Sequence, residues 1–206
     1  MVNTDYRRRQ MTGSARVPRT ELTGIQGGLL KLAIRKKLGE VPESIEVLWN
    51  NPAVFKDMMR MGAKVEKWDG VEPNLASLAA MAAAAEIGCS FCLDLNYFLA
   101  RDQGLDADKA REVPRWRDSE IFTPLERRVM EYAEAMCQTP LAVTDEMSAA
   151  LAADLGADGL VELTARVAFM NLSARANIAL GIRSEHFADS CGLQPLTTRP
   201  TPASMP

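Results

Sequence analysis

The sequence predicts an all-α protein, and three observations carry that prediction. Alanine, leucine and methionine are abundant while only 6% of the 206 residues are aromatic, a composition that favours helices over sheets. From residue 21 to residue 193, apolar residues recur at helical spacing with almost no strand-like alternation. Glycine, proline and capping residues divide this region into segments of helical length. We therefore expect a single helical domain over 21–193 with about seven to eight helices.

Five helices are expected in the first half of this domain. Leu29–Leu38 is amphipathic, ends in basic residues and stops at Gly39, which suits a helix C-terminus. Asn74–Ile87 is rich in alanine and is expected to be a buried helix. The five segments run, in order, over 29–38, from Pro42 through Trp49, and over 54–61, 74–87 and 90–104.

The clearest helix boundary follows a polar connection that contains Pro114 and Trp116. Thr123 is placed as an N-cap, Pro124 occupies the first helical position, and Glu126 comes three residues after the cap. These three residues predict a capping box at the start of a helix. The last three expected helices run over 124–137, 144–156 and 158–182.

The two ends of the sequence differ from the domain between them. Residues 1–20 contain five arginines without helical periodicity, so we expect a flexible basic arm, and the Pro-rich tail over 194–206 is expected to be disordered. No apolar segment follows the arginines, so a secretory signal is not expected and the predicted compartment is the cytoplasm. The net charge of −3 gives no general reason to expect nucleic acid or a membrane as a partner.

The motif that carries chemistry is "EIGCSFCLDLN", residues 86–96, which places Cys89 and Cys92 at C-x-x-C spacing. On a helix, both cysteines and Asn96 fall within roughly 60° of one another, with Glu86 a further 60° away. On nearly the opposite side lie the residues expected to face the main core, which are Phe91, Leu95 and Phe98.

Geometry favours a dithiol that cycles between reduced and oxidised forms. Residues three apart in a regular helix have Cβ atoms about 5–6 Å apart, whereas a relaxed disulfide needs about 3.8 Å. A Cys89–Cys92 bond therefore requires a distorted turn, and Gly88 is placed to permit one. If Gly88 breaks the helix, Cys89 lies at the N-terminus of the next helix, where free N–H groups and the helix dipole favour a thiolate.

Two other interpretations of the motif stay open. Cysteines on an alanine-rich helix are often small buried hydrophobes. A zinc site would need two more ligands, and the remaining candidates, Cys137, Cys191 and His186, form no second pair. We expect no metal and no organic cofactor, and we interpret Cys137 and Cys191 as structural.

Three segments resemble the carboxymuconolactone decarboxylase family, and more closely its alkyl hydroperoxidase D-like branch, which has the C-x-x-C: "AAAEIGCSFCLDLNYFLARDQGL", "FTPLERRVMEYAEAM" and "VAFMNLSARANIALGI". The resemblance covers roughly residues 41–182. It implies a helical fold that forms homo-oligomers, often trimers or hexamers. It also implies that Cys92 attacks a small hydroperoxide, that Cys89 resolves the sulfenic acid as a disulfide, and that a thioredoxin-like or lipoyl-type dithiol donor reduces the protein.

The sequence departs from the peroxidase pattern at two positions. Asn96 stands where that pattern has histidine, and Ser77 stands where it has glutamate. An amide can orient a thiol or a water, but it cannot accept a proton near neutral pH. Glu86 is a possible assisting base, and Asn96 a possible assisting polar group. We therefore expect an antioxidant thiol–disulfide oxidoreductase whose peroxidase activity is weak.

Two further functions remain as alternatives. One is a non-redox lyase of the carboxymuconolactone decarboxylase type, and the other is a non-enzymatic oligomeric binding protein with inert thiols. Near the C-terminus, "NLSARAN" contains Asn171, Arg175 and Asn177, which we interpret as structural polar contacts, with an oligomer contact as the alternative.

Overall fold

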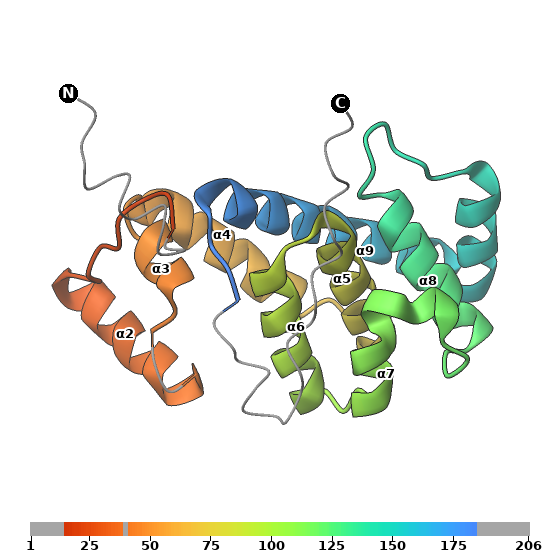
Figure 1. Cartoon of the computed structure of the whole chain (residues 1–206), viewed down its shortest axis with the longest axis horizontal. Coiled ribbons are helices and arrows are strands. Elements are labelled where there is room, and N and C mark those ends of the chain that lie inside the picture. Colours follow the sequence, from red (N-terminus) through yellow and green to blue (C-terminus); the bar gives the residue numbers. More distant parts are fainter. Residues whose placement is uncertain (1–14, 39–40, 185–206) are drawn as a thin grey trace, which may run out of the picture.

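The computed structural model describes residues 15–38 and 41–184, and within these ranges the protein is helical without a strand (Figure 1). This architecture confirms the all-α prediction. Eight α-helices and one 3-10 helix follow one another in the order α2 (Gly24–Leu38), α3 (Glu43–Leu48), α4 (Pro52–Val65), α5 (Pro73–Ile87), α6 (Ser90–Asp102), α7 (Ala107–Glu112), η1 (Val113–Asp118), α8 (Pro124–Ala135) and α9 (Asp145–Leu180).

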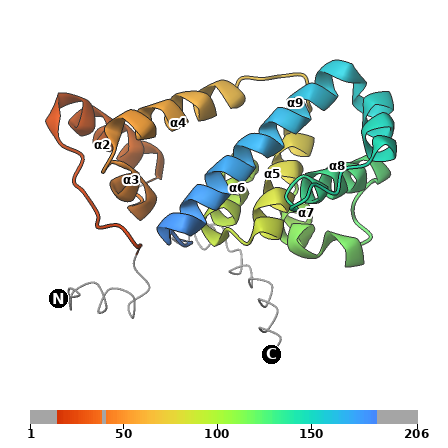
Figure 2. The same ribbon diagram turned by 90° about the horizontal axis from the view of Figure 1, so that it is seen from above.

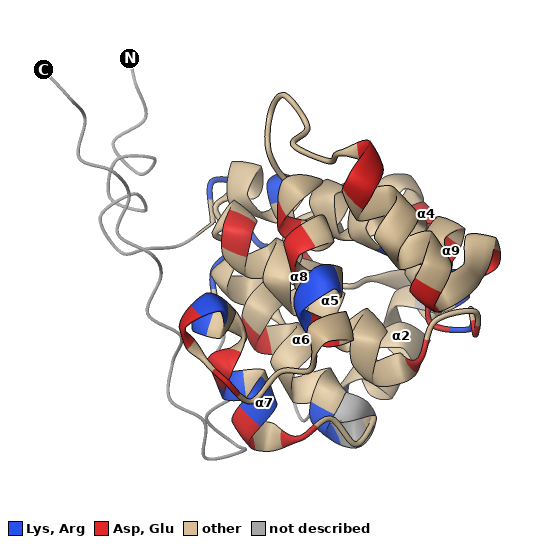
Figure 3. Ribbon diagram, turned by 90° about the vertical axis from the view of Figure 1, so that its right-hand side faces the viewer, with Lys and Arg blue, Asp and Glu red and all other residues tan. Residues whose placement is uncertain are grey.

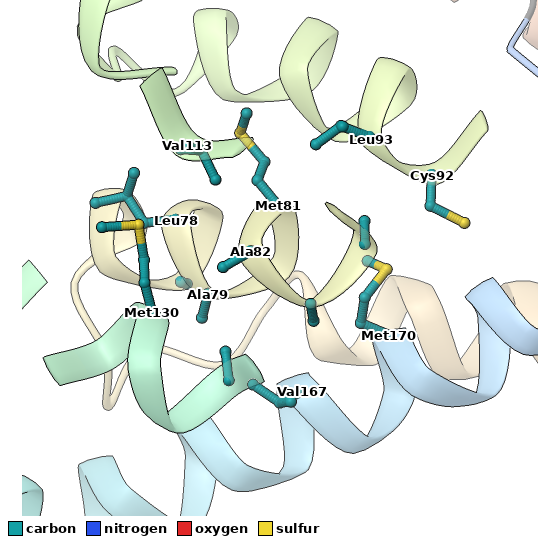
Figure 4. Packing of buried hydrophobic residues seen from close by; sticks show 14 of the residues in the cluster. Leu78, Ala79, Met81, Ala82, Cys92, Leu93, Val113, Met130, Val167 and Met170 are labelled. Carbon is teal, nitrogen blue, oxygen red and sulfur yellow. The ribbon is translucent and has the colours of Figure 1, made fainter. Parts of the chain in front are cut away.

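Helix α5 is the centre of the core. It is apolar nearly all round, as expected for a helix enclosed by others. Its alanines present little side-chain bulk, so the neighbouring helices approach closely. Figure 4 shows its side chains enclosed by residues from α6, η1, α8 and α9, and the labelled residues are Leu78, Ala79, Met81, Ala82, Cys92, Leu93, Val113, Met130, Val167 and Met170.

A second, smaller cluster joins the first three described helices. Leu22, Trp49 and Phe55 are buried together, and the rings of Trp49 and Phe55 meet edge to face with centroids 5.4 Å apart. Figure 2 shows α2, α3 and α4 grouped at one end of the molecule, with α9 running along the bundle at the other end. The cysteine motif belongs to the larger cluster.

Several predicted helix boundaries are confirmed. Thr123 and Glu126 form the capping box at the start of α8, where each side chain accepts a hydrogen bond from the backbone N–H of the other residue. Gly156 interrupts α9 with a φ of 75°, so the predicted break between two helices is present as a kink.

The polar connection before Thr123 is more ordered than the sequence indicated. Asp106 caps α7 by accepting hydrogen bonds from two backbone N–H groups, and η1 buries Trp116, whose Nε1 donates to Glu134 at 2.8 Å. Both helices contain six residues, which is too short for apolar periodicity to show. Figure 3 shows Lys and Arg interspersed with Asp and Glu on the face that includes α7.

Part of the predicted basic arm lies against the domain. Ala15 is buried, and the backbone N–H of Arg16 donates to the carbonyl of Leu180 at 2.7 Å. Residues 1–14 and 185–206, with Cys191, His186 and the predicted tail, lie outside the described residues. Among the helices that are described, none has the length and apolar character needed to cross a membrane.

Candidate functional site

The candidate site begins with a break between two helices. Gly88 ends α5 in the left-handed conformation with a φ of 82°, and Cys89 follows in an extended conformation as the N-cap of α6. Glycine adopts a positive φ without the steric penalty that a Cβ brings. The predicted break at Gly88, and the position of Cys89 at a helix N-terminus, are both confirmed.

The break brings the two sulfur atoms together. Cys89 and Cys92 form a disulfide with their Cα atoms 5.3 Å apart, inside the usual range for disulfides. The Cys89 Sγ also accepts a hydrogen bond from the backbone N–H of Cys92 at 3.2 Å. Both sulfur atoms therefore belong to the first turn of α6, at the positive end of its dipole.

The pair is buried within the protomer. Cys89 is 1% exposed and Cys92 is 3% exposed, and both belong to the main hydrophobic cluster. The sequence placed the core on the other side of α6, and this expectation is wrong in part. Phe91 is buried, but Leu95 and Phe98 are only partly buried. Because α6 carries apolar residues around its circumference, its own sequence does not determine which side faces α5.

Asn177 reaches the pair from α9, 85 residues further along the chain. Its Nδ2 donates a hydrogen bond to the Cys92 Sγ at 3.4 Å, and the residue is 7% exposed. We grouped this asparagine with structural polar contacts on sequence grounds. One signal marks it: Asn177 is the polar member of a buried stripe with alternating spacings of four and three, formed by Leu163, Val167, Met170, Ala174 and Asn177.

The two assisting residues proposed from the sequence have other contacts. The Asn96 Nδ2 donates to the carbonyl of Cys92 at 2.7 Å, so this amide is tied to its own helix backbone. Glu86 is partly buried, and its negative charge helps to raise the pKa of the Cys137 thiol. Ser77, at the position of the family's glutamate, donates to Gln103 Oε1 at 2.8 Å.

Cys137 provides an internal contrast because it is a free, buried cysteine two residues beyond the end of α8. Its thiol donates to the carbonyl of Ala133 at 3.0 Å, and the Asn171 Nδ2 donates to its Sγ at 3.3 Å. Burial raises its pKa to about 11, with the charges of Glu86 and Glu134 adding to the rise and the Asn171 hydrogen bond opposing it. This thiol is protonated at neutral pH.

The segment after α9 covers the N-terminal turn of α6. Ile182 is buried, and the backbone N–H of Ser184 donates to Ser90 Oγ at 3.2 Å. The hydroxyl of Ser184 donates to Asp94 Oδ2 at 2.9 Å. A surface pocket lined by residues 114–118 and Glu134 includes neither cysteine of the pair. Within the described ranges, no three His, Cys, Asp or Glu residues are grouped so that they could hold a metal ion.

The chain belongs to the carboxymuconolactone decarboxylase family. Residues 52–135 match the model of that family. The predicted family is therefore confirmed, and the family includes enzymes.

Two curated relatives align with this chain over most of their own length. The uncharacterized protein YnjA of Escherichia coli (strain K12) is 35% identical over 152 residues, which cover 73% of this chain and 84% of YnjA. The uncharacterized protein YdfG of Bacillus subtilis (strain 168) is 25% identical over 134 residues, which cover 65% of this chain and 90% of YdfG.

Solved structures show the same fold. A peroxidase-related protein from Ralstonia eutropha JMP134, described as an alkylhydroperoxidase AhpD core, superposes with a TM-score of 0.74 at 22% identity, covering 84% of this chain and 95% of that one. The debrominase Bmp8, in a variant complexed with 2,3,4-tribromopyrrole, gives a TM-score of 0.72 at 19% identity over 83% of this chain and 93% of its own. At these identities the likeness shows the fold alone.

Proposed function

We propose that this protein is a thiol–disulfide oxidoreductase of the alkyl hydroperoxidase D-like type, which cycles Cys89 and Cys92 between a dithiol and a disulfide. One observation carries the proposal: the helix break at Gly88 places both sulfur atoms in the first turn of α6, close enough to be bonded. A helix N-terminus favours the thiolate, which is the reactive form of cysteine.

The proposed reaction uses the two electrons of the dithiol. The Cys92 thiolate attacks one oxygen of a small hydroperoxide, the O–O bond breaks, and the leaving alkoxide takes a proton from solvent to become an alcohol. Cys92 is then a sulfenic acid. The Cys89 thiol attacks the Cys92 sulfur, a water molecule leaves, and the disulfide forms. The cycle as written uses no metal and no organic cofactor.

The disulfide is returned to the dithiol by an external dithiol of the thioredoxin-like or lipoyl type. Such a donor forms a mixed disulfide with one cysteine and leaves as its own disulfide, so the two electrons and two protons enter together. The sulfur atoms are buried, so a donor reaches them only if the segments packed around them move. The proposed cycle fits a reducing compartment such as the cytoplasm.

Peroxide reduction is expected to be weak in this protein. Asn96 and Ser77 replace the two acid–base residues of the peroxidase pattern, and their side chains bond to a backbone carbonyl and to Gln103. General acid–base help is typically worth about 10²–10⁴-fold in rate. Turnover would then depend on a cysteine that is already ionised rather than on one that is deprotonated during the reaction.

The test combines turnover with identification of the disulfide. The reduced protein is treated with tert-butyl hydroperoxide, the 89–92 linkage is sought by peptide mass spectrometry, and turnover is followed with thioredoxin or dihydrolipoamide as donor. Cys89→Ser and Cys92→Ser are expected to abolish turnover, whereas Cys137→Ser retains it. The proposal is wrong if no 89–92 disulfide forms, or if Cys92→Ser turns over like the unsubstituted protein.

The same variants separate the two alternative functions. A lactone decarboxylation that survives substitution of both Cys89 and Cys92 would indicate a non-redox lyase. Thiols that resist alkylation in the native protein would indicate a binding protein with inert cysteines. Because Bmp8 shares the fold and is a debrominase whose variant binds 2,3,4-tribromopyrrole, binding of that compound to this protein is a useful additional assay.

We further propose that the protein forms a homo-oligomer, such as a trimer or hexamer. Val161 and Leu172 are 70% and 57% exposed and lie three turns apart on one side of α9, which leaves an apolar stripe uncovered in the protomer. Light scattering coupled to size exclusion would measure the assembly. Leu172→Glu is expected to dissociate it, while Leu141→Glu, at a loop position that is 66% exposed, leaves it intact.

A further inference from the structure

The hydrogen bond between Asn177 and Cys92 has chemical significance beyond packing. The donor is a side-chain amide 7% exposed, the acceptor is the sulfur of a residue 3% exposed, and the distance between Nδ2 and Sγ is 3.4 Å. Few polar groups are buried in this cluster, and a buried amide needs a partner to offset its lost hydration. Here that partner is one of the two sulfur atoms that change oxidation state in the proposed function.

Reduction of the disulfide increases the stabilisation that this hydrogen bond provides. In the disulfide, the Cys92 sulfur is neutral and a weak acceptor. In the reduced protein, a thiolate at the same place would be buried and would lose most of its hydration, which disfavours the charge. Hydrogen bonds to a charged acceptor are roughly twice as strong as those between neutral groups, so the amide N–H preferentially stabilises the ionised sulfur.

Two other polar groups of the motif donate to different acceptors. Asn96 donates to a backbone carbonyl, and the backbone N–H of Cys92 donates to the other sulfur, that of Cys89. The first turn of α6 contributes its dipole to both cysteines. The hydrogen bond from Asn177 reaches Cys92 rather than Cys89, so this side chain acts on one sulfur of the pair.

We propose that Asn177 is a catalytic residue that holds the reduced Cys92 sulfur as a thiolate by donating its side-chain N–H to it. This inference rests on the proposed function for its role in turnover, but the contact itself can be tested without any substrate. Asn177 transfers no proton, because an amide does not titrate near neutral pH. It therefore replaces the assistance of an acid–base pair with a fixed dipole that favours the charge before the oxidant arrives.

Asn177→Leu removes the donor while keeping a side chain of similar size, and Asn177→Ala removes it with a smaller one. The measurement is the rate of iodoacetamide alkylation of the Cys92 peptide against pH, in a Cys89→Ser background where no disulfide can form. Serine is also a good N-cap, so this background preserves the start of α6. Both Asn177 variants are expected to raise the titration midpoint of Cys92 by about one to two pH units.

The rate of peroxide reduction gives a second readout, taken with both cysteines present. At neutral pH the Asn177 variants should be slower by about three- to tenfold, because the smaller thiolate fraction is partly offset by a more nucleophilic thiolate. The deficit should disappear at alkaline pH, where the thiol is fully ionised in every variant. A purely structural role would lower the rate at all pH values.

Asn171→Leu is the matched control, since Asn171 lies on the same helix and donates to the sulfur of Cys137 at 3.3 Å. It should leave the Cys92 midpoint unchanged. The inference is overturned if both Asn177 variants keep the unsubstituted midpoint, or if Asn171→Leu shifts it equally. If the midpoint moves as expected but the unsubstituted protein shows no dithiol–disulfide turnover, the proposed function fails and the role of Asn177 toward Cys92 stands.

Discussion

Helix α9 presents two asparagines to two cysteines, and the two pairs have opposite surroundings. Asn177 donates to Cys92 at 3.4 Å, and Asn171 donates to Cys137 at 3.3 Å. All four side chains are at least partly buried. The hydrogen bond is nearly the same in both pairs, so any difference in the reactivity of the two thiols comes from elsewhere.

The difference lies in which end of a helix each cysteine occupies. Cys92 lies in the first turn of α6, where unpaired N–H groups favour negative charge. Cys137 lies just beyond the C-terminal end of α8, where its thiol donates to the carbonyl of Ala133 and Glu134 adds negative charge nearby. A single amide donor therefore does not make a buried cysteine reactive, and the helix terminus decides whether its contribution is reinforced or opposed.

The largest expected effect is a direct contrast between the two cysteines of the reduced protein. A thiol with a pKa of about 11 has so little thiolate at neutral pH that, after its greater nucleophilicity is allowed for, it should react at least about 20-fold more slowly than an ordinary thiol. We expect iodoacetamide to modify Cys92 faster than Cys137 by at least this factor. Equal alkylation rates for the Cys92 and Cys137 peptides would contradict this comparison.

The N-terminal end of α8 gives a second test of how a helix terminus affects a charged group, because the carboxylate of Glu126 lies in its first turn. Burial would raise the pKa of Glu126, but hydrogen bonds from Lys109 and from the Thr123 backbone N–H lower it overall. Glu126→Gln should cost about 2 kcal/mol of the free energy of unfolding at neutral pH, because it weakens hydrogen bonds to a charged group.

This cost depends on pH in a defined direction. A carboxylate whose pKa is lowered by folding stabilises the protein above its unfolded value of 4.5, and that stabilisation is lost as the pH falls through the lower folded value. Urea unfolding of Glu126→Gln and of the unsubstituted protein should therefore converge in acid. A gap that persists at low pH would mean that packing, rather than charge, sets the cost.

A substitution at Gly88 tests whether the helix break is needed to place Cys92 at the N-terminus of α6. Apart from its two chain neighbours, no described residue has an atom within 4 Å of a Cβ built at this glycine, so the penalty of Gly88→Ala comes from its φ of +82° rather than from a clash. We expect a loss of about 1 kcal/mol in the free energy of unfolding and slower formation of the 89–92 disulfide. Gly28→Ala, in α2 with equally open space, is the control and should stabilise slightly.

The smallest expected effect concerns Glu86. Removing its charge with Glu86→Gln should lower the pKa of Cys137, because that charge contributes to raising it. Turnover at Cys92 should change less than about twofold, since the loss of an assisting base would cost about 10²-fold or more. A large loss of turnover would restore Glu86 as the base that the sequence first indicated.

The sequence predicted the parts of the site that depend on neighbouring residues. Gly88, Cys89 and Cys92 act within one turn of chain, so glycine's conformational freedom and the C-x-x-C spacing were sufficient to predict the break and the pair. Asn177 was not predicted as part of the site because its contact spans 85 residues. Which side of α6 faces the core was predicted only in part, since that depends on how α5 packs.

The helices likewise divide into those predicted from neighbouring residues and those that depend on contacts with distant residues. Capping residues predicted the start of α8, and Gly156 predicted the kink in α9. Helices α7 and η1 were not predicted because each has only six residues, and Trp116 is held in place by a hydrogen bond to Glu134 from α8. Short elements of this kind are stabilised by tertiary contacts that no local pattern contains.

The contact between Arg16 and the end of α9 has a consequence for the order in which the site is built during translation. The guanidinium of Arg16 donates to the carbonyls of Ile178 and Ala179, joining residues up to 163 positions apart in the turn that carries Asn177. Cys89 and Cys92 are synthesised long before this turn. Until α9 docks, the two cysteines of the emerging chain are not enclosed by it, so they should be alkylated more readily in the ribosome-bound protein than in the finished one, even though Cys92 then lacks its amide donor.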